Sequence, residues 1–286
     1  MISFEVQLDH LIDEALKEDT GDGDHSTLSC IPPGEKGKAV LKIKEDGILA
    51  GINVAKRIFQ YKEDSVFTAF KKDGDEMKSG EQAFEIKASV HTILQCERLV
   101  LNCMQRMSGI ATLTRLYADK LKGYKTKLLD TRKTTPNFRL LEKESIKIGG
   151  GFNHRFGLYD MIMLKDNHID FCGGIEKAIQ KAAEYVKTKK PGSKIEIETR
   201  SIDDVKKVIN TGAGIVFRIM LDNFKPGQIT EAVAIINGQF ETEASGGINL
   251  GNIQEYAATG VDYISAGALI HQARSLDMSL KAVIDK

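Results

Sequence analysis

LLDTRKTTPNFRLLEKESIKIGGGFNHRFGLYDMIMLKDNHI, residues 128–169, is the stretch of this chain that says most about its fold. It contains two short apolar runs, and each run ends abruptly in polar, mostly cationic residues. The first run is followed by residues 131–133 (TRK) and the second by residues 165–168 (KDNH), with three glycines and residues 153–155 (NHR) between them. Cationic side chains placed directly after strands predict a site for a ligand that carries several negative charges.

These two runs belong to a longer series of apolar runs that alternate with helical or glycine-marked segments. Six such runs follow residue 125, at residues 127–130, 160–164, 194–198, 216–221, 240–244 and 261–266. Repeated strand–helix units of this kind are typical of a parallel sheet, and six or more of them indicate an α/β barrel, complete or partial. The second half of the chain is therefore predicted to form such a barrel.

The first part of the chain follows a different pattern. Apolar residues have helical spacing in residues 7–18 and 52–61, whereas residues 65–70 and 82–88 alternate as strands do, and residues 38–49 predict two strands around an Asp46-Gly47 turn. These elements predict an α+β unit with an antiparallel sheet. A long helical pattern then runs from Thr92 to about Leu121, with a break expected near Ser108-Gly109.

Arg98 lies inside this long and mostly apolar helical segment. One interpretation is an arginine that pairs with Glu97 or another neighbour. The other is an arginine that packing holds and aims at a binding site. The spacing alone leaves both interpretations open.

Composition limits the classes of function. The chain has 286 residues, and its 40 basic residues balance 40 acidic ones. Nucleic-acid and membrane-surface binding need a basic field, so neither partner is expected. None of the four cysteines forms a C-x-x-C pair or has zinc spacing, and no segment has the character of a signal peptide or a membrane span. We expect a soluble cytoplasmic protein with reduced thiols.

The ends of the predicted strands carry groups of matched chemistry. The early strands supply cations, the middle strands supply Glu198 and Asp222, and the late strands supply glycines. Arginine binds carboxylates or phosphates through two parallel hydrogen bonds, and lysine suits phosphate oxygens as a point charge. Two carboxylates on consecutive strands can bind one divalent cation or a pair of sugar hydroxyls. Main-chain N–H groups of a Ser-Gly-Gly turn suit a terminal phosphate.

Taken singly, each of these residues is more often a solvated rim residue or part of an ordinary turn. The set as a whole, ordered along six strands, favours a ligand site. No phosphate-binding P-loop, dinucleotide-binding fingerprint or Ser-His-Asp arrangement accompanies it. The chain therefore gives no sign of an organic cofactor.

Several of these motifs resemble the quinolinate phosphoribosyltransferases, the decarboxylating nicotinate-nucleotide pyrophosphorylases. The matching motifs cover nearly the whole chain: EDTGDGDHST at residues 18–27, ERLVLNCMQRMSGIAT at 97–112, DTRKTTP at 130–136, GGG-x-NHR at 149–155, KDNHI at 165–169, LDNF at 221–224, ASGGI at 244–248 and GALIH at 267–271. The chain departs from the family at Asn137, where glycine is usual, and in HQARSLDMSL at residues 271–280. A longer gap before Asp222 makes Glu196 an alternative to Glu198.

The resemblance implies an α/β fold with an N-terminal α/β sandwich domain and an incomplete barrel of about seven strands. The expected domains are residues 1–110, with residues 272–286 packing back on them, and residues 111–271. The implied reaction joins quinolinate to 5-phosphoribosyl-1-diphosphate and gives nicotinate mononucleotide, diphosphate and carbon dioxide in NAD biosynthesis. Mg²⁺ would be bound with the phosphoribosyl substrate, without an organic cofactor. A homodimer or higher oligomer would share its active sites.

The family's site residues map onto this chain as expected roles. Two carboxylates of quinolinate would be bound by Arg132, His154, Arg155 and, from a second subunit, Arg98, with Thr131 contributing beside Arg132. Lys133 and Lys165 would face the diphosphate and the reacting atoms, and Glu198 and Asp222 would hold the ribose hydroxyls and Mg²⁺; these four are the expected catalytic residues. The 5-phosphate would be bound by Ser245, Gly246, Gly247, Ala266, Gly267, Ala268 and His271.

Two other functions compete with this expectation. One is a related transferase that uses another base, such as nicotinate, or a paralogue found in molybdenum operons. The paired arginines favour a dicarboxylate instead. The other is a non-catalytic sensor of a phosphate ligand on the same barrel, and Lys165, Glu198 and Asp222 speak against it because sensing does not need them.

Overall fold

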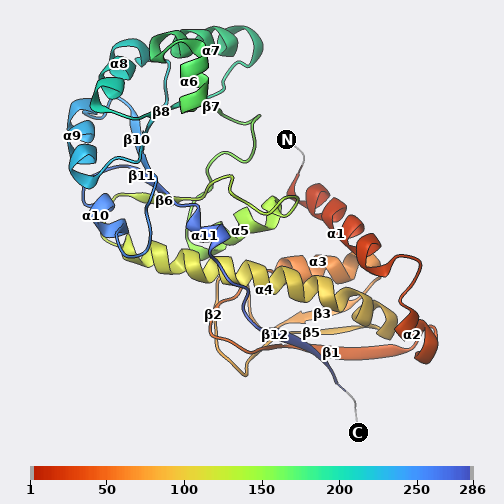
Figure 1. The fold of residues 1–286 in the computed structure, drawn as a ribbon. Coiled ribbons are helices and arrows are strands. Elements are labelled where there is room, and N and C mark those ends of the chain that lie inside the picture. Colours follow the sequence, from red (N-terminus) through yellow and green to blue (C-terminus); the bar gives the residue numbers. More distant parts are fainter. Residues whose placement is uncertain (1–2, 284–286) are drawn as a thin grey trace. The chain divides into compact units, whose positions relative to one another are not determined.

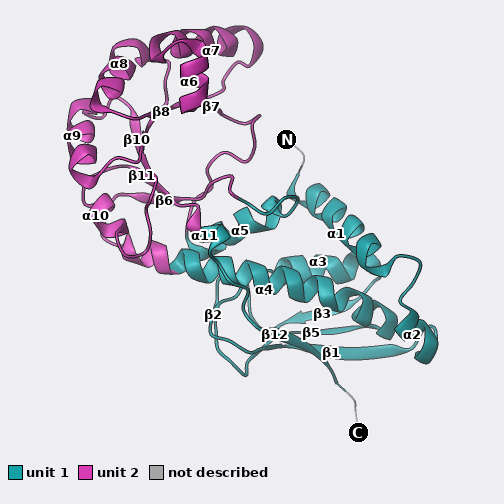
Figure 2. Cartoon of the chain, viewed as in Figure 1, with its two compact units in different colours: residues 1–115, 134–150, 269–286 teal, residues 116–133, 151–268 magenta. Residues whose placement is uncertain are grey.

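The computed structural model describes residues 3–283 and divides into two compact units (Figure 2). Unit 1 contains residues 1–115, 134–150 and 269–286, and unit 2 contains residues 116–133 and 151–268. The predicted fold class is confirmed, because unit 1 contains an antiparallel sheet and unit 2 contains an open, parallel α/β sheet. The division into domains at residues 110 and 271 stays a prediction, and each unit is described by itself below.

The main sheet of unit 1 has four antiparallel strands in the order β12 (Met278–Ala282), β1 (Lys36–Ile43), β5 (Gln82–Ser89) and β3 (Val66–Ala69). The hairpin predicted around Asp46-Gly47 is wrong. β2 (Gly47–Ile48) pairs with β4 (Glu76–Met77) rather than with β1. The Asp46 carboxylate accepts a hydrogen bond from the main-chain N of Ser79 at 2.9 Å, so it helps to fix a loop between distant strands.

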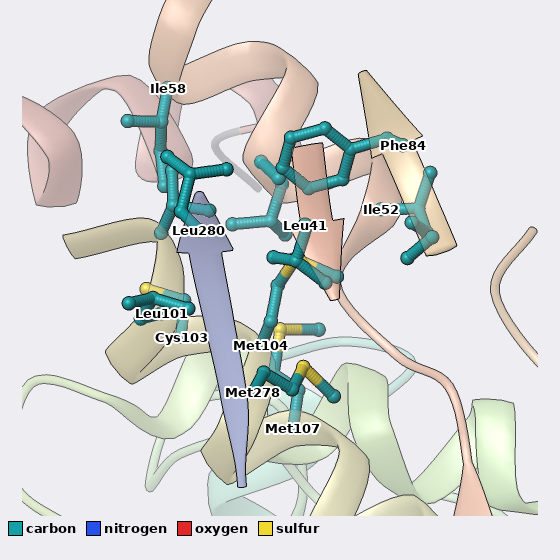
Figure 3. Close-up of a cluster of buried hydrophobic side chains, with 14 of the residues drawn as sticks. Leu41, Ile52, Ile58, Phe84, Leu101, Cys103, Met104, Met107, Met278 and Leu280 are labelled. Atoms are coloured by element: carbon teal, nitrogen blue, oxygen red, sulfur yellow. The ribbon is translucent and has the colours of Figure 1, made fainter. Parts of the chain in front are cut away.

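The helices of unit 1 are α1 (Phe4–Thr20), α2 (His25–Cys30), α3 (Ile52–Lys62), α4 (Val90–Lys120), which continues into unit 2, α5 (Arg139–Gly149) and most of α11 (Ala268–His271). Figure 3 shows the core that they form with the sheet, where Leu41 and Phe84 from the strands lie near Ile58 of α3 and Met104 of α4. All four of these side chains are fully buried, so their apolar surface stabilises this unit.

The helix α4 is continuous over 31 residues, without the break expected near Ser108-Gly109. Gly109 instead allows another segment of the chain to pack closely on the helix. A Cβ atom added at Gly109 would lie 1.8 Å from the carbonyl oxygen of Arg274, so the glycine allows the segment before β12 to pack directly on the helix. The hydroxyl of Ser108 accepts a hydrogen bond from the main-chain N of Ala50 at 2.9 Å.

Gly109→Ala is therefore expected to lower the free energy of unfolding by about 3 kcal/mol, because main-chain atoms cannot move aside as a flexible side chain can. The matched control is Gly227→Ala near the start of α9 (Pro226–Ile236), where an added Cβ meets nothing within 4 Å. That control should be neutral or stabilising by up to about 1 kcal/mol. Urea unfolding of both variants measures the difference, and equal effects would contradict the packing role of Gly109.

Unit 2 contains a six-stranded parallel sheet in the order β6 (Lys127–Leu129), β11 (Tyr263–Ser265), β10 (Glu241–Ser245), β9 (Arg218–Asp222), β8 (Ile195–Thr199) and β7 (Ile162–Leu164). Each strand falls within or largely overlaps one of the six predicted runs. Phe152 adds an isolated parallel bridge to Leu129 on the free side of β6. Within residues 3–283, no ladder joins this bridge to β7, so the barrel is incomplete, as predicted.

Helices cover the outer side of this curved sheet (Figure 1). They are α6 (Asp166–Cys172), α7 (Ile175–Lys189), α8 (Ile202–Gly212), α9 and α10 (Ile253–Ala257). Among residues 3–283, no helix is both long enough and apolar enough to cross a membrane.

The two faces of the sheet in unit 2 have opposite chemistry. Side chains alternate between faces along a strand, so Ile195 and Ile197 of β8 face one way and Glu196 and Glu198 face the other. The apolar positions are buried beneath the helices. The opposite, inner face carries charges on three successive strands: Glu196, Glu198, Arg218, Asp222, Glu241 and Glu243. The sheet is therefore built around a charged interior.

Candidate active site

Lys165 and Glu198 form the first part of the site at the carboxyl ends of β7 and β8. The Lys165 ammonium group contacts Oε1 of Glu198, whose side chain is almost fully buried. Oε2 of Glu198 accepts a hydrogen bond from the main-chain N of Asp166 at 3.2 Å, at the first residue of α6. The carboxylate thus contacts both a cation and the main-chain N–H at the start of α6.

Asp222 lies at the end of the neighbouring strand β9 and is half-buried. Burial raises the pKa of Asp222, and the nearby carboxylate of Glu198 raises it further. The amide of Asn223 donates a hydrogen bond to Oδ2 of Asp222 at 2.7 Å. Two carboxylates that repel each other at adjacent strand ends suit a divalent cation with oxygen ligands, since the cation removes the repulsion.

Arg132 and Arg155 form the second part of the site. Arg132 follows β6, and Arg155 lies in the segment between the Phe152 bridge and β7. Burial lowers the pKa of Arg155, and so does the positive charge of Arg132 beside it. The Nε atoms of both arginines are buried and have no hydrogen-bond acceptor among residues 3–283. Two adjacent guanidinium groups with free donors are suited to a ligand that has more than one carboxylate.

His154 points into the interior of the sheet. Its Nε2 lies 3.1 Å from Oε2 of Glu196 and 3.2 Å from Oε2 of Glu243, and both glutamates are fully buried. Nδ1 accepts a hydrogen bond from the main-chain N of Arg155 at 2.7 Å. In the neutral ring both nitrogens are engaged, so binding of a substrate carboxylate by His154, which stays a prediction, requires the loss of one of these contacts.

Opposing effects set the protonation of this cluster. Burial lowers the pKa of His154, but Glu196 and Glu243 outweigh burial and raise that pKa to about 9. When the His154 ring gains its second proton, only the contact between Nδ1 and the main-chain N of Arg155 is lost. The contacts of Nε2 with the two carboxylates remain. Burial and the charge of Glu243 raise the pKa of Glu196 to about 7. Glu196, the alternative to Glu198 as the sugar or metal ligand, thus lies inside this cluster. Glu198 lies at the strand end with Lys165.

The glycine turn after β10 forms the third part. Gly246 has φ of 96° and Gly247 has φ of 65°, which only glycine adopts easily. A Cβ atom on Gly246 would lie 2.2 Å from Oδ1 of Asn223, so the turn packs tightly against the end of β9. Within residues 3–283 the N–H groups of both glycines lack a protein acceptor. They are therefore available to an anion beside Ser245.

The other predicted phosphate ligands differ in whether the protein already uses their hydrogen-bonding groups. The N–H of Ala266 donates to the carbonyl of Leu129 at 3.1 Å, so sheet pairing already uses it. Gly267 and Ala268 follow β11 in unit 2, at a strand end like the glycine turn. His271 is exposed on α11 and belongs to unit 1, which leaves its predicted role open.

Three further predicted site residues are Thr131, Lys133 and Arg98. Thr131 caps the loop after β6, since its hydroxyl accepts a hydrogen bond from the main-chain N of Lys133 at 3.1 Å. The Lys133 side chain is exposed. Arg98 is exposed on α4 in unit 1, and its guanidinium group forms no ion pair with Glu97 or any other of residues 3–283. The interpretation of Arg98 as a locally paired residue therefore has no support.

Sequence reasoning missed a set of buried ionic residues. In unit 1, Arg106 donates from Nη2 to Oε1 of the fully buried Glu142 at 2.8 Å, and Oε2 of Glu142 accepts from the main-chain N of Thr135 at 2.8 Å. In unit 2, the missed residues are Arg218 and Glu243, and Glu196, which the sequence offered only as an alternative to Glu198, belongs to the same group. The signal for these unit 2 residues was the alternation of charged and apolar residues along the strands. Strands of a parallel sheet are usually apolar on both faces.

Comparison with known proteins decides the family. Residues 24–108 match the family description "Quinolinate phosphoribosyl transferase, N-terminal domain", and residues 110–281 match the corresponding C-terminal domain. The chain belongs to the quinolinate phosphoribosyltransferase family. The resemblance seen in the sequence motifs is thereby confirmed.

Individual relatives are similar over most of their length. The chloroplastic, carboxylating nicotinate-nucleotide pyrophosphorylase of Arabidopsis thaliana is 43% identical over 281 residues, which cover 93% of this chain and 80% of the relative. The probable enzyme of the same name from Bacillus subtilis is 40% identical, with 98% and 94% covered. The crystal structure of NadC from Streptococcus pyogenes has a TM-score of 0.90 at 39% identity, covering 99% of this chain and 100% of that chain.

Proposed function

We propose that this protein is a quinolinate phosphoribosyltransferase of de novo NAD biosynthesis. It joins quinolinate to 5-phosphoribosyl-1-diphosphate and yields nicotinate mononucleotide, diphosphate and carbon dioxide. The observation that carries the proposal is the pair Arg132 and Arg155, whose buried Nε donors find no acceptor among the described residues 3–283. Two such groups suit the two carboxylates of quinolinate. The relatives named as nicotinate-nucleotide pyrophosphorylases support the same reaction.

The reaction divides between the two sides of the site. The bond between C1 of the ribose and the diphosphate oxygen breaks, and positive charge develops on C1. The pyridine nitrogen of quinolinate then bonds to C1 and becomes a pyridinium. The bond between the ring and the adjacent carboxylate then breaks, and carbon dioxide leaves. The electron pair of that bond stays on the ring carbon, where the pyridinium stabilises it, and this carbon takes up a proton. The substrate itself thus supplies the electron sink, and orientation is the protein's main contribution.

The protein's charges match the charges that develop. Lys165, held by Glu198, faces the same strand ends as Asp222, and Lys133 follows β6 on an exposed loop. These lysines bind and stabilise the departing diphosphate. Gly246 and Gly247 offer main-chain N–H groups to the 5-phosphate, and the arginine pair orients the ring.

Glu198 and Asp222 are the residues that would hold Mg²⁺ in this proposal. Their mutual repulsion, seen in the raised pKa of Asp222, fits a cation with oxygen ligands. When bound, Mg²⁺ neutralises charge on the leaving diphosphate. No organic cofactor is part of the proposal.

A direct assay tests the reaction. The protein is incubated with quinolinate, phosphoribosyl diphosphate and Mg²⁺, while nicotinate mononucleotide and carbon dioxide are measured. A transferase for nicotinate would form the mononucleotide from nicotinate without releasing carbon dioxide. A phosphate-ligand sensor would form no product and would not exchange labelled diphosphate. Either of these results would contradict the proposal.

Asp222→Asn is expected to raise the Mg²⁺ concentration needed for half-maximal activity by about tenfold, because one charged ligand becomes neutral. Asp203→Asn is the matched control, since Asp203 is an exposed aspartate on α8 in the same unit. The control should leave the Mg²⁺ dependence unchanged. Titration of Mg²⁺ after chelation measures both variants, and equal curves for Asp222→Asn and wild type would count against the assigned metal site.

We also propose a homodimer or higher oligomer in which Arg98 from one subunit completes the site of another. The support is that Arg98 is exposed and forms no ion pair within residues 3–283, although it lies in a largely apolar helix. A cytoplasmic location is a further part of the proposal. It rests on the four free cysteines, of which Cys30 is exposed.

A further inference from the structure

A group of ionisable side chains lies on the inner face of the unit 2 sheet. Arg218 of β9 donates from Nη1 to Oε2 of Glu243 at 2.9 Å and from Nη2 to Oε2 of Glu241 at 2.9 Å. The same Nη1 lies 3.8 Å from Oε2 of Glu196. His154 completes the group through its contacts with Glu196 and Glu243. Arg218 is only 7% exposed, and its guanidinium carbon lies 4.0 Å from the ring centre of Tyr263.

Stability alone does not account for such a group. Burying several charges carries a large desolvation cost, and apolar side chains of similar size would often serve stability equally well. Strand interiors of barrels are usually filled by branched apolar residues. A buried ionic group that departs from this pattern requires an explanation in terms of what it holds in place.

A metal ion is the first explanation to consider. One ligand atom each from His154, Glu196 and Glu243 lie within 4.8 Å of one another, a spacing that suits a small cation. Arg218 argues against it, because its guanidinium already donates to the Oε2 of Glu243 that faces His154. A permanent positive charge at hydrogen-bonding distance from a ligand oxygen repels a second cation. The cluster is therefore a closed set of ion pairs.

The cluster is connected to the arginine pair through the main chain. The His154 ring is held between Glu196 and Glu243, and the main-chain N of His154 donates to Oδ1 of the fully buried Asp130 at 2.8 Å. Asp130 directly precedes residues 131–133 at the end of β6. Both ends of His154 are thus fixed, and the next residue along the chain is Arg155. The segment from residue 151 to 161 has no helix or strand of its own to fix it.

We propose that Glu196, Arg218 and Glu243 are positioning residues that anchor the His154 ring and thereby aim the Arg155 guanidinium at the carboxylates of the acceptor substrate. This inference rests on the proposed function. Glu196 and Glu243 never touch the substrate in this arrangement. They act through His154 and Arg155.

The test separates the two substrates. Glu243→Gln leaves the shape of the side chain and removes its charge, so the His154 ring loses one ion pair. It is expected to raise the KM for quinolinate about 10- to 100-fold, since a displacement of about 1 Å in an orienting group has effects of this size. The KM for phosphoribosyl diphosphate should change less than about twofold, because Glu243 lies deeper within β10 and contacts His154 and Arg218, whereas the residues assigned to that substrate lie at the strand ends. Equal increases in both KM values would overturn the inference.

A double-mutant cycle gives a second readout that a purely structural role would not produce. In an Arg155→Ala background, Glu243→Gln should have little further effect on the KM for quinolinate, because the residue through which it acts is gone. A full additional effect in that background would overturn the inference. Glu196→Gln repeats both measurements if Glu243→Gln does not fold, as judged by circular dichroism and thermal unfolding.

Two outcomes must be kept apart. If the wild-type protein forms no nicotinate mononucleotide, the proposed function itself fails. If the wild type is active but the variants show no selective change for quinolinate, only the positioning role fails. Metal analysis of the purified wild type completes the test, and a stoichiometric metal ion that is lost in Glu243→Gln would also overturn the inference.

Discussion

Arg155→Ala is expected to lower kcat/KM for quinolinate roughly 30- to 1000-fold, which corresponds to about 2–4 kcal/mol of lost transition-state binding. The reason is that Arg155 presents a buried Nε donor that has no acceptor in the described part of the chain, beside a second arginine with the same property. The like charges repel each other until an anion lies between them. The binding of quinolinate satisfies both arginines, and truncation of one leaves a substrate carboxylate without its partner.

Arg132→Ala should cause a loss of the same size, because the two guanidinium groups bind one dicarboxylate. Arg57→Ala is the control, since Arg57 is a partly exposed arginine on α3 that forms an ion pair with Asp9. The control should stay within about twofold of the wild type, as surface substitutions usually do. Steady-state kinetics with quinolinate at saturating phosphoribosyl diphosphate measure all three variants. An unchanged kcat/KM in either site variant would remove the basis for the acceptor site.

Sequence reasoning grouped residues that the structure also brings together where these residues follow directly from a strand end. The six apolar runs have the right length and spacing for parallel strands, and a parallel sheet brings all carboxyl ends to one edge. Lys165, Glu198 and Asp222 could therefore be grouped without knowledge of any distance. The placement of Lys165 against Glu198 in the structure agrees with that grouping.

The sequence could not separate residues that lie two positions apart on one strand. Glu196 and Glu198 face the same side of β8, and only the depth along the strand distinguishes them. The structure places Glu196 with His154 and Arg218, whereas Glu198 meets Lys165 and the start of α6. That difference depends on partners from distant segments, which local patterns do not contain.

Turn and helix-break signals failed for a related reason. Asp46-Gly47 has the composition of a hairpin turn, but β1 finds its partners in β5 and β12, which are far away in sequence. Gly109 resembles a helix breaker, but it permits close approach of the chain at Arg274. In both places tertiary packing determined the outcome, and local propensity was a weak guide.

The exposure of Arg98 is compatible with the proposed contact to a neighbouring subunit. An arginine in a long, mostly apolar helix usually finds a carboxylate nearby, and no such partner exists among residues 3–283. Substrates with several negative charges offer the same attraction as a carboxylate does. If Arg98 acts in the site of a neighbouring subunit, loss of Arg98 and loss of a barrel residue must complement each other.

Mixing Arg98→Ala subunits with Lys165→Ala subunits is therefore expected to restore about a quarter of the wild-type activity, although each variant alone is nearly inactive. Random exchange at equal amounts makes half of the dimers mixed, and each mixed dimer contains one site without either change. The control mixes Lys165→Ala with Arg132→Ala, where both changes lie in unit 2, so every site stays defective. Differently tagged chains that co-purify establish the exchange. If exchange occurs and the first mixture stays inactive, Arg98 acts within its own chain or not at all.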